Sequence, residues 1–191
     1  EIKDSLKLCG YLEGILQKII NLFASENVEL KKLSIAVVTE IISHYPTIVK
    51  QSDELLKVAF EFTALEREGT TEQFSYALSL LSNAIKFSNI MFINAMYEDL
   101  FGFSKELFSI EDRQLELFIF RLFEELIRRT QSDFYELVIT QLSEFVDYIL
   151  TNLHGSGEYD EKPFLFRMQN ICHTMKVIIK YIPLPDEAYS D

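Results

Sequence analysis

The amino-acid sequence predicts an all-α protein made of about four antiparallel helix pairs stacked in a row. Hydrophobic residues make up 48% of the 191 residues, but there are only 6 glycines and 4 prolines. So few helix-breaking residues favour long helices over a β domain with many turns. Apolar residues also recur at helical spacing along most of the chain, and one such stripe is repeated at a constant offset. A fixed repeat of about 40 residues indicates stacked units rather than one compact bundle.

The repeated stripe first appears in the helix expected from 71 to 88. Its apolar positions are Phe74, Ala77, Leu78, Leu81 and Ile85. The helix expected from 111 to 130 carries Leu115, Phe118, Ile119, Leu122 and Leu126, all at the same distance after their counterparts in the first stripe. Spacings of three and four residues place each set on one face of its helix. Both faces are therefore expected to be buried.

An earlier and a later copy of the stripe are also expected. Counting back by the same offset leads to three apolar positions and then two polar ones, namely Leu33, Ala36, Val37, Glu40 and His44. The pattern predicts an apolar face at the first three, continued by Ile41 and Ile42. The last copy has its stripe at Phe164, Met168, Ile171, Met175 and Ile178.

The other helices complete the four pairs. The expected boundaries are 4–24 with 28–44, 47–66 with 71–88, 90–108 with 111–130, and 133–153 with 161–182. Residues that favour N-caps mark four starts, at Ser25 or Asn27, Ser52 or Asp53, Thr70 or Thr71, and Ser132 or Asp133. A capping box is predicted from Asp133 to Glu136, and an interruption at Gly102.

These pairs are expected to form one domain over residues 1–191. Its units span 4–44, 47–88, 90–130 and 133–182, and an acidic tail follows at 183–191. A polar loop from His154 to Pro163 lengthens the last unit. Each pair has apolar residues on more than one face, so it has to stack on its neighbours to bury them.

At its turns the sequence resembles the HEAT-repeat family. The motif of that family is an apolar helix, a turn with Asp or Asn, an apolar residue, a basic residue and a second helix. The segment NLFASENVELKKLSIAVV fits this order, with Asn27, Leu30 and Lys31 in the motif positions. ELFSIEDRQLELFIF departs from it because Asp112 and Arg113 are adjacent, and REGTTEQF lacks the basic residue. The resemblance covers most of the chain and implies a right-handed α-α superhelix.

Within that family, the run EIISHYPTIVKQSDELLKVAF is similar to the importin-β and exportin type of nuclear transport receptor. In those receptors a tyrosine–proline bridge often joins one repeat to the next, and Tyr45 and Pro46 occupy that place here. This resemblance implies binding of protein cargo and of a Ran-type GTPase. The alternative is a helical scaffold segment of a large kinase or ubiquitin ligase, or of another HEAT-repeat assembly factor.

The net charge of the chain limits the kinds of molecule that it is expected to bind. There are 30 acidic residues against 18 Lys and Arg, which gives a net charge of −12. Such a chain repels phosphate backbones, so nucleic acid is not an expected partner, whereas basic protein segments are attracted. The alternative interpretation of the charge is a solvated surface that keeps the protein soluble. No apolar stretch is long enough to span a bilayer.

The cellular setting is expected to be intracellular, in the cytoplasm or nucleus. Cys9 and Cys172 lie in helical apolar patterns and are expected to be buried free thiols. The first residues lack the features of a signal peptide. Because the sequence starts at Glu1 and reads as helix by Asp4, we also expect it to be part of a longer chain.

No catalytic chemistry is expected, and no cofactor or metal. The sequence has no metal-binding spacing and no phosphate-binding loop. His44 suits a helix end, and His154 and His173 lack a convincing catalytic partner. Acidic pairs such as Glu124 and Glu125 are expected to serve as caps or surface charges. Candidate partner-binding residues are the polar side chains of the second helices: Lys31, Lys32, Glu40, Glu116 and Arg128.

Overall fold

A computed structural model of the chain describes residues 2–46, 53–108, 110, 112–139 and 161–182. The structure is 86% helical, and no strand occurs in these ranges. The predicted all-α class is therefore confirmed. The right-handed superhelix of HEAT-like pairs stays a prediction. The predicted tail at 183–191 and most of the loop from His154 lie outside the described residues.

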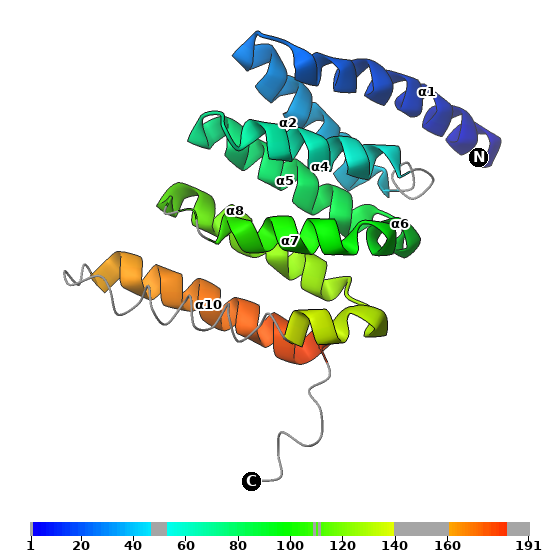
Figure 1. Ribbon diagram of the computed structural model, residues 1–191. Helices are drawn as coiled ribbons and strands as arrows, with labels where there is room; N and C mark the ends of the chain where they lie inside the picture. Colours follow the sequence, from blue (N-terminus) through cyan, green and yellow to red (C-terminus); the bar gives the residue numbers. More distant parts are fainter. Residues whose placement is uncertain (1, 47–52, 109, 111, 140–160, 183–191) are drawn as a thin grey trace.

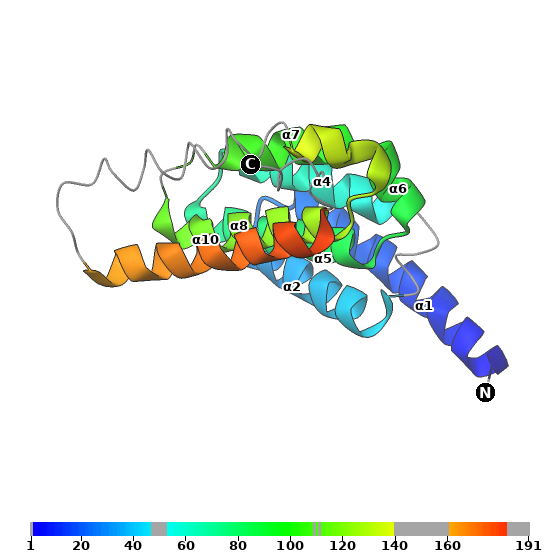
Figure 2. The ribbon, with the colours of Figure 1, turned by 90° about the horizontal axis from the view of Figure 1, so that it is seen from below.

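The described helices follow one another along the chain. They are α1 (Ile2–Ile20), η1 (Asn21–Ala24), α2 (Val28–His44), α4 (Glu54–Glu66), α5 (Thr71–Phe87), α6 (Ile90–Ala95), α7 (Tyr97–Leu107), α8 (Arg113–Arg128), η2 (Ser132–Phe134) and α10 (Glu161–Tyr181). Hairpins of successive helices follow one another down the molecule (Figure 1). Seen from below, α2, α5, α8 and α10 form one layer, and α4, α6 and α7 lie on the other side (Figure 2).

Three of the four helices in the first of these layers begin at a side-chain N-cap. Asn27 accepts a hydrogen bond from the Leu30 amide, and Asp112 accepts one from the Gln114 amide. Thr70 accepts from the Gln73 amide, and the Gln73 side chain returns to the Thr70 amide in a capping box. Each cap satisfies amides that have no partner within the helix, which fixes where α2, α8 and α5 start.

Two of the predicted caps are not formed. Asp53 precedes α4 without a side-chain cap bond and pairs with Lys57 instead. The capping box predicted from Asp133 to Glu136 is wrong, because Asp133 lies inside the short 3-10 helix η2. That turn brings the Phe134 ring onto the Tyr97 ring, with 4.3 Å between the centroids.

The interruption predicted at Gly102 is also wrong in its position. Gly102 lies within α7, and space for a Cβ atom there is open. The break falls at Met96, which has φ −118° and ψ 8° and separates α6 from α7. Tyr97, the first residue after the break, is fully buried and bonds to the Thr130 hydroxyl. The break thus places the Tyr97 ring in the core, beside a hydroxyl at the end of α8.

The core follows the layer of second helices. Helix α2 packs on α5, α5 on α8, and α8 on α10. The predicted stripe of α5 is buried at all five positions. In α8 four of the five are buried, and Phe118 is half-buried. In the other layer, ring contacts join Phe23 to Phe62 at 4.8 Å and Phe60 to Phe103 at 5.5 Å.

The predicted apolar face of α2 is wrong at its first three positions, whereas its continuation at Ile41 and Ile42 is half-buried and buried. Leu33 is 62% exposed, Val37 is 37% exposed, and Ala36 is exposed too. The buried residues of α2 are instead Ser34, Ile35, Val38 and Ile42. The physical reason is register. The N-caps Asn27 and Thr70 are two residues farther apart than the constant offset assumes, so the extrapolated stripe is turned away from the core.

One cysteine prediction is also corrected. The Cys172 thiol is free, as expected, but exposed rather than buried. It lies on α10, whose Thr174 donates to Glu124 of α8 and whose Ile171 and Ile178 are buried. The Cys9 side chain lies outside the described residues. Within the described helices, none is long and apolar enough to cross a membrane.

Candidate protein-binding surface

Ion pairs join the first two hairpins near their turns. Lys31 of α2 donates to the Glu66 carboxylate at the end of α4, with Nζ and Oε1 2.7 Å apart. Lys32 donates to Glu72 at the start of α5, also at 2.7 Å, and lies 3.5 Å from Glu29 of its own helix. The hydrogen bond to Glu72 is the main cause that raises the pKa of Lys32. These pairs fix the register of α2 on α4 and α5.

The next interface has a similar arrangement. Arg67, just after α4, donates to Glu106 of α7 at 2.8 Å. The Thr71 hydroxyl donates to the Asp112 carboxylate at 2.8 Å, so the N-cap of α8 is also bonded to the preceding helix. In both interfaces the earlier hairpin supplies the donors and the later one supplies the carboxylates.

At the opposite ends of these helices the contacts are polar but mostly neutral. Asn94 of α6 donates to the Gln131 side chain at 2.8 Å. Arg129, after α8, donates to the Ser88 backbone carbonyl. Burial lowers the pKa of Arg129, and the nearby Glu125 carboxylate opposes that shift. The arginine therefore bridges two turns rather than facing a partner.

A buried carboxylate joins α8 to α10. Glu124 accepts from the Thr174 hydroxyl at 2.8 Å and from Arg128 at 3.2 Å, and the His173 Nε2 atom lies 3.8 Å away. Sequence reasoning predicted a cap or surface role for Glu124 and missed this role between helices. The spacing from Glu124 to Arg128 signalled only the bond within α8. Nothing in the sequence linked Glu124 to Thr174, 50 residues later.

The five predicted partner-binding residues have different environments. Lys31 and Lys32 are half-buried in the ion pairs between hairpins, and Arg128 binds Glu124 and Glu125 on its own helix. Glu116 is half-buried near the start of α8, while Glu40 is exposed beside His44. The structure thus brings Lys31 and Lys32 together and places Arg128 at the far end of another helix. Their role in binding a partner stays a prediction.

The second helices also carry a row of exposed side chains, and the sequence analysis did not identify this row. Leu33, Tyr76 and Phe118 each lie six residues after the N-cap of α2, α5 and α8, namely Asn27, Thr70 and Asp112. Leu33 and Tyr76 are exposed and Phe118 is half-exposed. We call these three residues the outer row. It could have been found by counting from the caps rather than by a constant offset along the sequence.

A polar row runs beside the outer row. Glu40, Asn83 and Glu125 occupy one equivalent position, two helical turns beyond the outer row on the same three helices. Glu40 is exposed, and Asn83 and Glu125 are half-buried. Helices α2, α5 and α8 are neighbours in one layer (Figure 2), so the two rows run across adjacent helices. Together they give an apolar strip beside a polar row whose two carboxylates, Glu40 and Glu125, pair with His44 and Arg128 of their own helices.

Other kinds of site have less support. Among the described residues, no group of three or more His, Cys, Asp or Glu side chains could hold a metal ion. Comparison of the chain with protein-family models, with curated proteins and with solved structures finds no match. The features that bear on function are therefore the geometry of the helices and the side chains that they leave exposed.

Proposed function

We propose that the chain is a non-catalytic protein-binding scaffold that binds through the outer face of α2, α5 and α8. The observation that carries the proposal is the outer row, an apolar side chain at the same helical position in three consecutive second helices. Leu33 and Tyr76 are exposed and contribute little to the core, and Phe118 is only half-buried against it, so the apolar character of the row is better explained by a partner. Large aromatic and aliphatic side chains are typical anchors of protein interfaces.

The charge around the row indicates a basic partner. Glu40 and Glu125 lie along its margin, where a partner would compete with His44 and Arg128 of their own helices, and the whole chain carries a net charge of −12. Lysine and arginine side chains of a partner could pair with these carboxylates while their alkyl stems cover the apolar row. Opposite charges would raise the rate of association, and salt would reduce that gain.

In its most specific form, the proposal is a nuclear transport receptor segment that binds protein cargo and a Ran-type GTPase. Its support is the resemblance at Tyr45 and Pro46, together with the position of Tyr45 as the C-cap of α2. The backbone amide of Tyr45 donates to the Ile41 carbonyl, so the tyrosine–proline pair ends that helix. A lysine- and arginine-rich import-signal peptide has the chemistry that the acidic margin would attract.

The test is a fluorescence titration of the protein with such a peptide, and separately with duplex DNA, at low and at physiological salt. We expect the peptide to bind more weakly at the higher salt and the DNA not to bind. The double variant Leu33→Ser, Tyr76→Ser should lose the peptide. Leu65→Ser is the matched control, because Leu65 is also exposed but lies on α4, outside the second-helix layer. Equal peptide affinity for the double variant and the wild type would overturn the proposal.

A further inference from the structure

Helices α5 and α8 run in the same direction and are joined at both ends. At their starts, the Thr71 hydroxyl of α5 donates to Asp112, the N-cap of α8. At their other ends, Arg129 after α8 donates to the backbone carbonyl of Ser88, just after α5. Because start is bonded to start and end to end, the two helices lie parallel and in register.

Helix α2 starts beside α5 as well, since Lys32 donates to Glu72 in the first turn of α5. Residues at equal distances from their N-caps therefore lie next to one another, and the outer row runs straight across the three helices. Packed helices lie about 8–10 Å apart, so the side chains of the row recur at that interval. Tyr76 is exposed although α5 has a helix of the layer on either side, so its exposure does not depend on where the stack begins.

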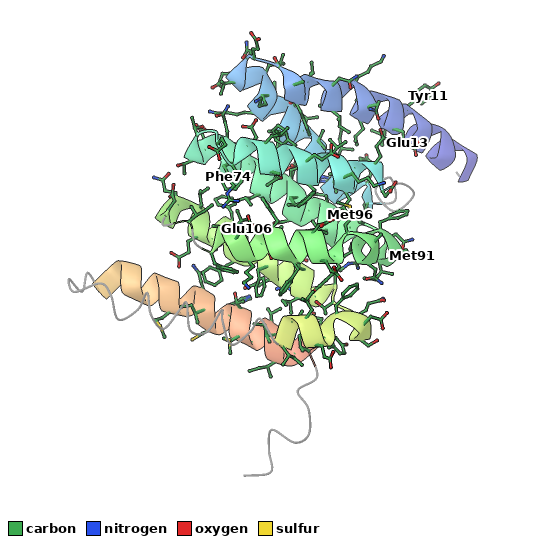
Figure 3. The ribbon with its side chains drawn as sticks, in the orientation of Figure 1. Tyr11, Glu13, Phe74, Met91, Met96 and Glu106 are labelled. Atoms are coloured by element: carbon green, nitrogen blue, oxygen red, sulfur yellow. The ribbon has the colours of Figure 1, made fainter. Side chains whose placement is uncertain are left out.

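The outer row is about one side chain wide along the helices. On α5, Phe74 is buried within the stack (Figure 3), whereas Tyr76, two residues later, is exposed. Small or polar side chains, exposed or half-buried, occupy the equivalent positions about one turn away: Glu29, Glu72 and Gln114 before the row, and Ala36, Ser79 and Arg121 after it. One helical turn is about 5.4 Å, and extended chains lie about 4.8 Å apart in sheets, so the strip has the width of one extended chain.

We propose that the outer row binds a partner segment in the polyproline II conformation with an apolar residue at every third position. The inference rests on the proposed function and specifies the partner of the same surface. A polyproline II segment has three residues per turn and rises about 3.1 Å per residue. Every third side chain thus returns to the same side after about 9 Å, which matches the spacing of neighbouring helices. The three apolar residues contact Leu33, Tyr76 and Phe118 in turn.

The other regular conformations match the row less well. In a β-strand the side chains alternate, so every third residue faces the opposite side. An α-helix can place every seventh residue on the row, because seven residues span about 10 Å. However, an α-helix is about 10–12 Å across, so its apolar face would also cover the polar side chains of Glu72 and Arg121 and remove water from them. A polyproline II segment covers only the row and keeps its own backbone in water.

Charges beside the row differ between its two ends. On α2, Glu29 and Glu40 are exposed, whereas on α8 the exposed charged side chain beside the row is that of Arg121. Glu29 lies 3.5 Å from Lys32, and Glu40 lies 3.3 Å from His44, so a basic group of the partner would share these carboxylates. The carboxylate of the polar row on α8 is bonded to an arginine of its own helix. The partner segment therefore has basic residues at the end over α2 and an acidic residue at the end over α8.

The test is a fluorescence titration of the protein with three labelled peptides. The first has leucine at every third position among proline and serine, two lysines at one end and two glutamates at the other. The second has the same composition with the leucines at alternate positions. The third has alanine in place of proline and leucine at every seventh position, so that it forms a helix. We expect the first to bind at least roughly tenfold more tightly than the others, about the contribution of one buried apolar side chain.

A double-mutant cycle between protein and peptide tests the register. Replacing the middle leucine of the first peptide with serine should weaken binding to the wild type by roughly tenfold but have little effect on binding to Tyr76→Ser, since the two side chains contact each other. Replacing an end leucine should weaken binding to both proteins. Tyr76 is exposed, so Tyr76→Ser should keep the helix content of the wild type in circular dichroism. Additive losses for the middle leucine and Tyr76→Ser would overturn the proposal.

The lysine- and arginine-rich peptide used to test the proposed function distinguishes the two possible failures. If that peptide binds and depends on Leu33 and Tyr76, but the helical peptide binds as tightly as the polyproline II peptide, the proposed function holds and the polyproline II conformation is wrong. The same conclusion follows if none of the three designed peptides binds. If the basic peptide binds equally to the wild type and to Leu33→Ser, Tyr76→Ser, the proposed function and the polyproline II partner are both wrong.

Discussion

The middle of the molecule and its first helix pair carry similar apolar stripes but bury them to different extents. In α5 and α8 both flanks of the stripe are covered, because each helix lies between two others of its layer. In α2 the flank that faces α5 is buried at Ile35, Val38 and Ile42, while Val37 on the other flank is exposed. The same helical position is thus core in one region and surface in another.

This difference shows that neighbours decide burial in a stacked array. The stripe of one helix makes a face apolar, but a second helix has to cover that face before it stabilises the fold. A substitution at one position should therefore have a large effect in the middle of the molecule and a small one in the first pair. The following predictions test that contrast.

Truncation of Leu122 should have the largest effect. Leu122 is fully buried in α8, so Leu122→Ala should lower the free energy of unfolding by about 2–5 kcal/mol. At the equivalent position of α2, Val37→Ala should cost well under about 1 kcal/mol, because Val37 is partly in water already. Chemical denaturation measures both. Equal losses at the two positions would contradict the contrast between the regions.

Ionisation of a buried tyrosine should have the next largest effect on stability, and this effect should occur in the middle of the molecule but not in the first pair. Burial raises the pKa of Tyr97 to about 12 from its ordinary value of 10.0. Above pH 10 the unfolded chain loses this proton while the folded chain keeps it, so the free energy of unfolding falls as pH rises from about 10 to 12. The contribution is constant below about pH 10 and amounts to at most roughly 2.7 kcal/mol, the free energy that corresponds to this difference in pKa.

The measurement is the stability of wild type and Tyr97→Phe across that pH range. The phenylalanine variant lacks the ionising group, so its stability should fall less steeply with pH, even though it loses the bond to Thr130. Tyr11→Phe, at an exposed position of the first pair, is the control. Parallel curves for wild type and Tyr97→Phe would show that Tyr97 is not buried as described.

The ion pair between Lys31 and Glu66 should have a smaller effect. Both side chains are largely buried and their atoms are 2.7 Å apart, so a double-mutant cycle of Lys31→Met and Glu66→Gln should give a coupling of about 1–2 kcal/mol. The pair of Asp53 and Lys57 is much more exposed and lies within one turn of α4, so it should give no measurable coupling. An equally large coupling for Asp53 and Lys57 would mean that the location of an ion pair between two hairpins does not increase its coupling energy.

Sequence patterns were sufficient for the fold class and for the middle helices. The stripes of α5 and α8 and the caps at Asn27 and Thr70 follow from local spacing and local hydrogen bonds, which a single segment encodes. The face of α2 was wrong because connections between helices vary in length. The offset between the stripes of α5 and α8 gives positions in α2 that are displaced by two residues from the buried ones. A displacement of two residues is enough to reach the opposite side of a helix.

The site was harder to predict because it depends on contacts between distant segments. Lys31 and Lys32 are basic residues near a turn, and nothing local shows that their partners are Glu66 and Glu72. Glu124 looked like one surface acid among many, because its bond to Thr174 spans two helices. The outer row became visible only after the helix starts were fixed, since the row is defined by distance from the caps.

The smallest effect on stability is expected at the exposed apolar positions of the first pair. Leu30 and Val37 are 39% and 37% exposed in the folded protein, so replacing either with serine removes less buried apolar area than at a core position. The loss should stay below about 1 kcal/mol in chemical denaturation, plus the small difference in helix propensity. Serine at the equivalent buried positions Leu115 and Leu122 should be far more costly, because it would leave a hydroxyl and a cavity in the core. A loss above about 1 kcal/mol at Leu30 or Val37 would show that this flank is covered within the chain itself. A near-zero loss would confirm that the same helical position is core in α8 and surface in α2.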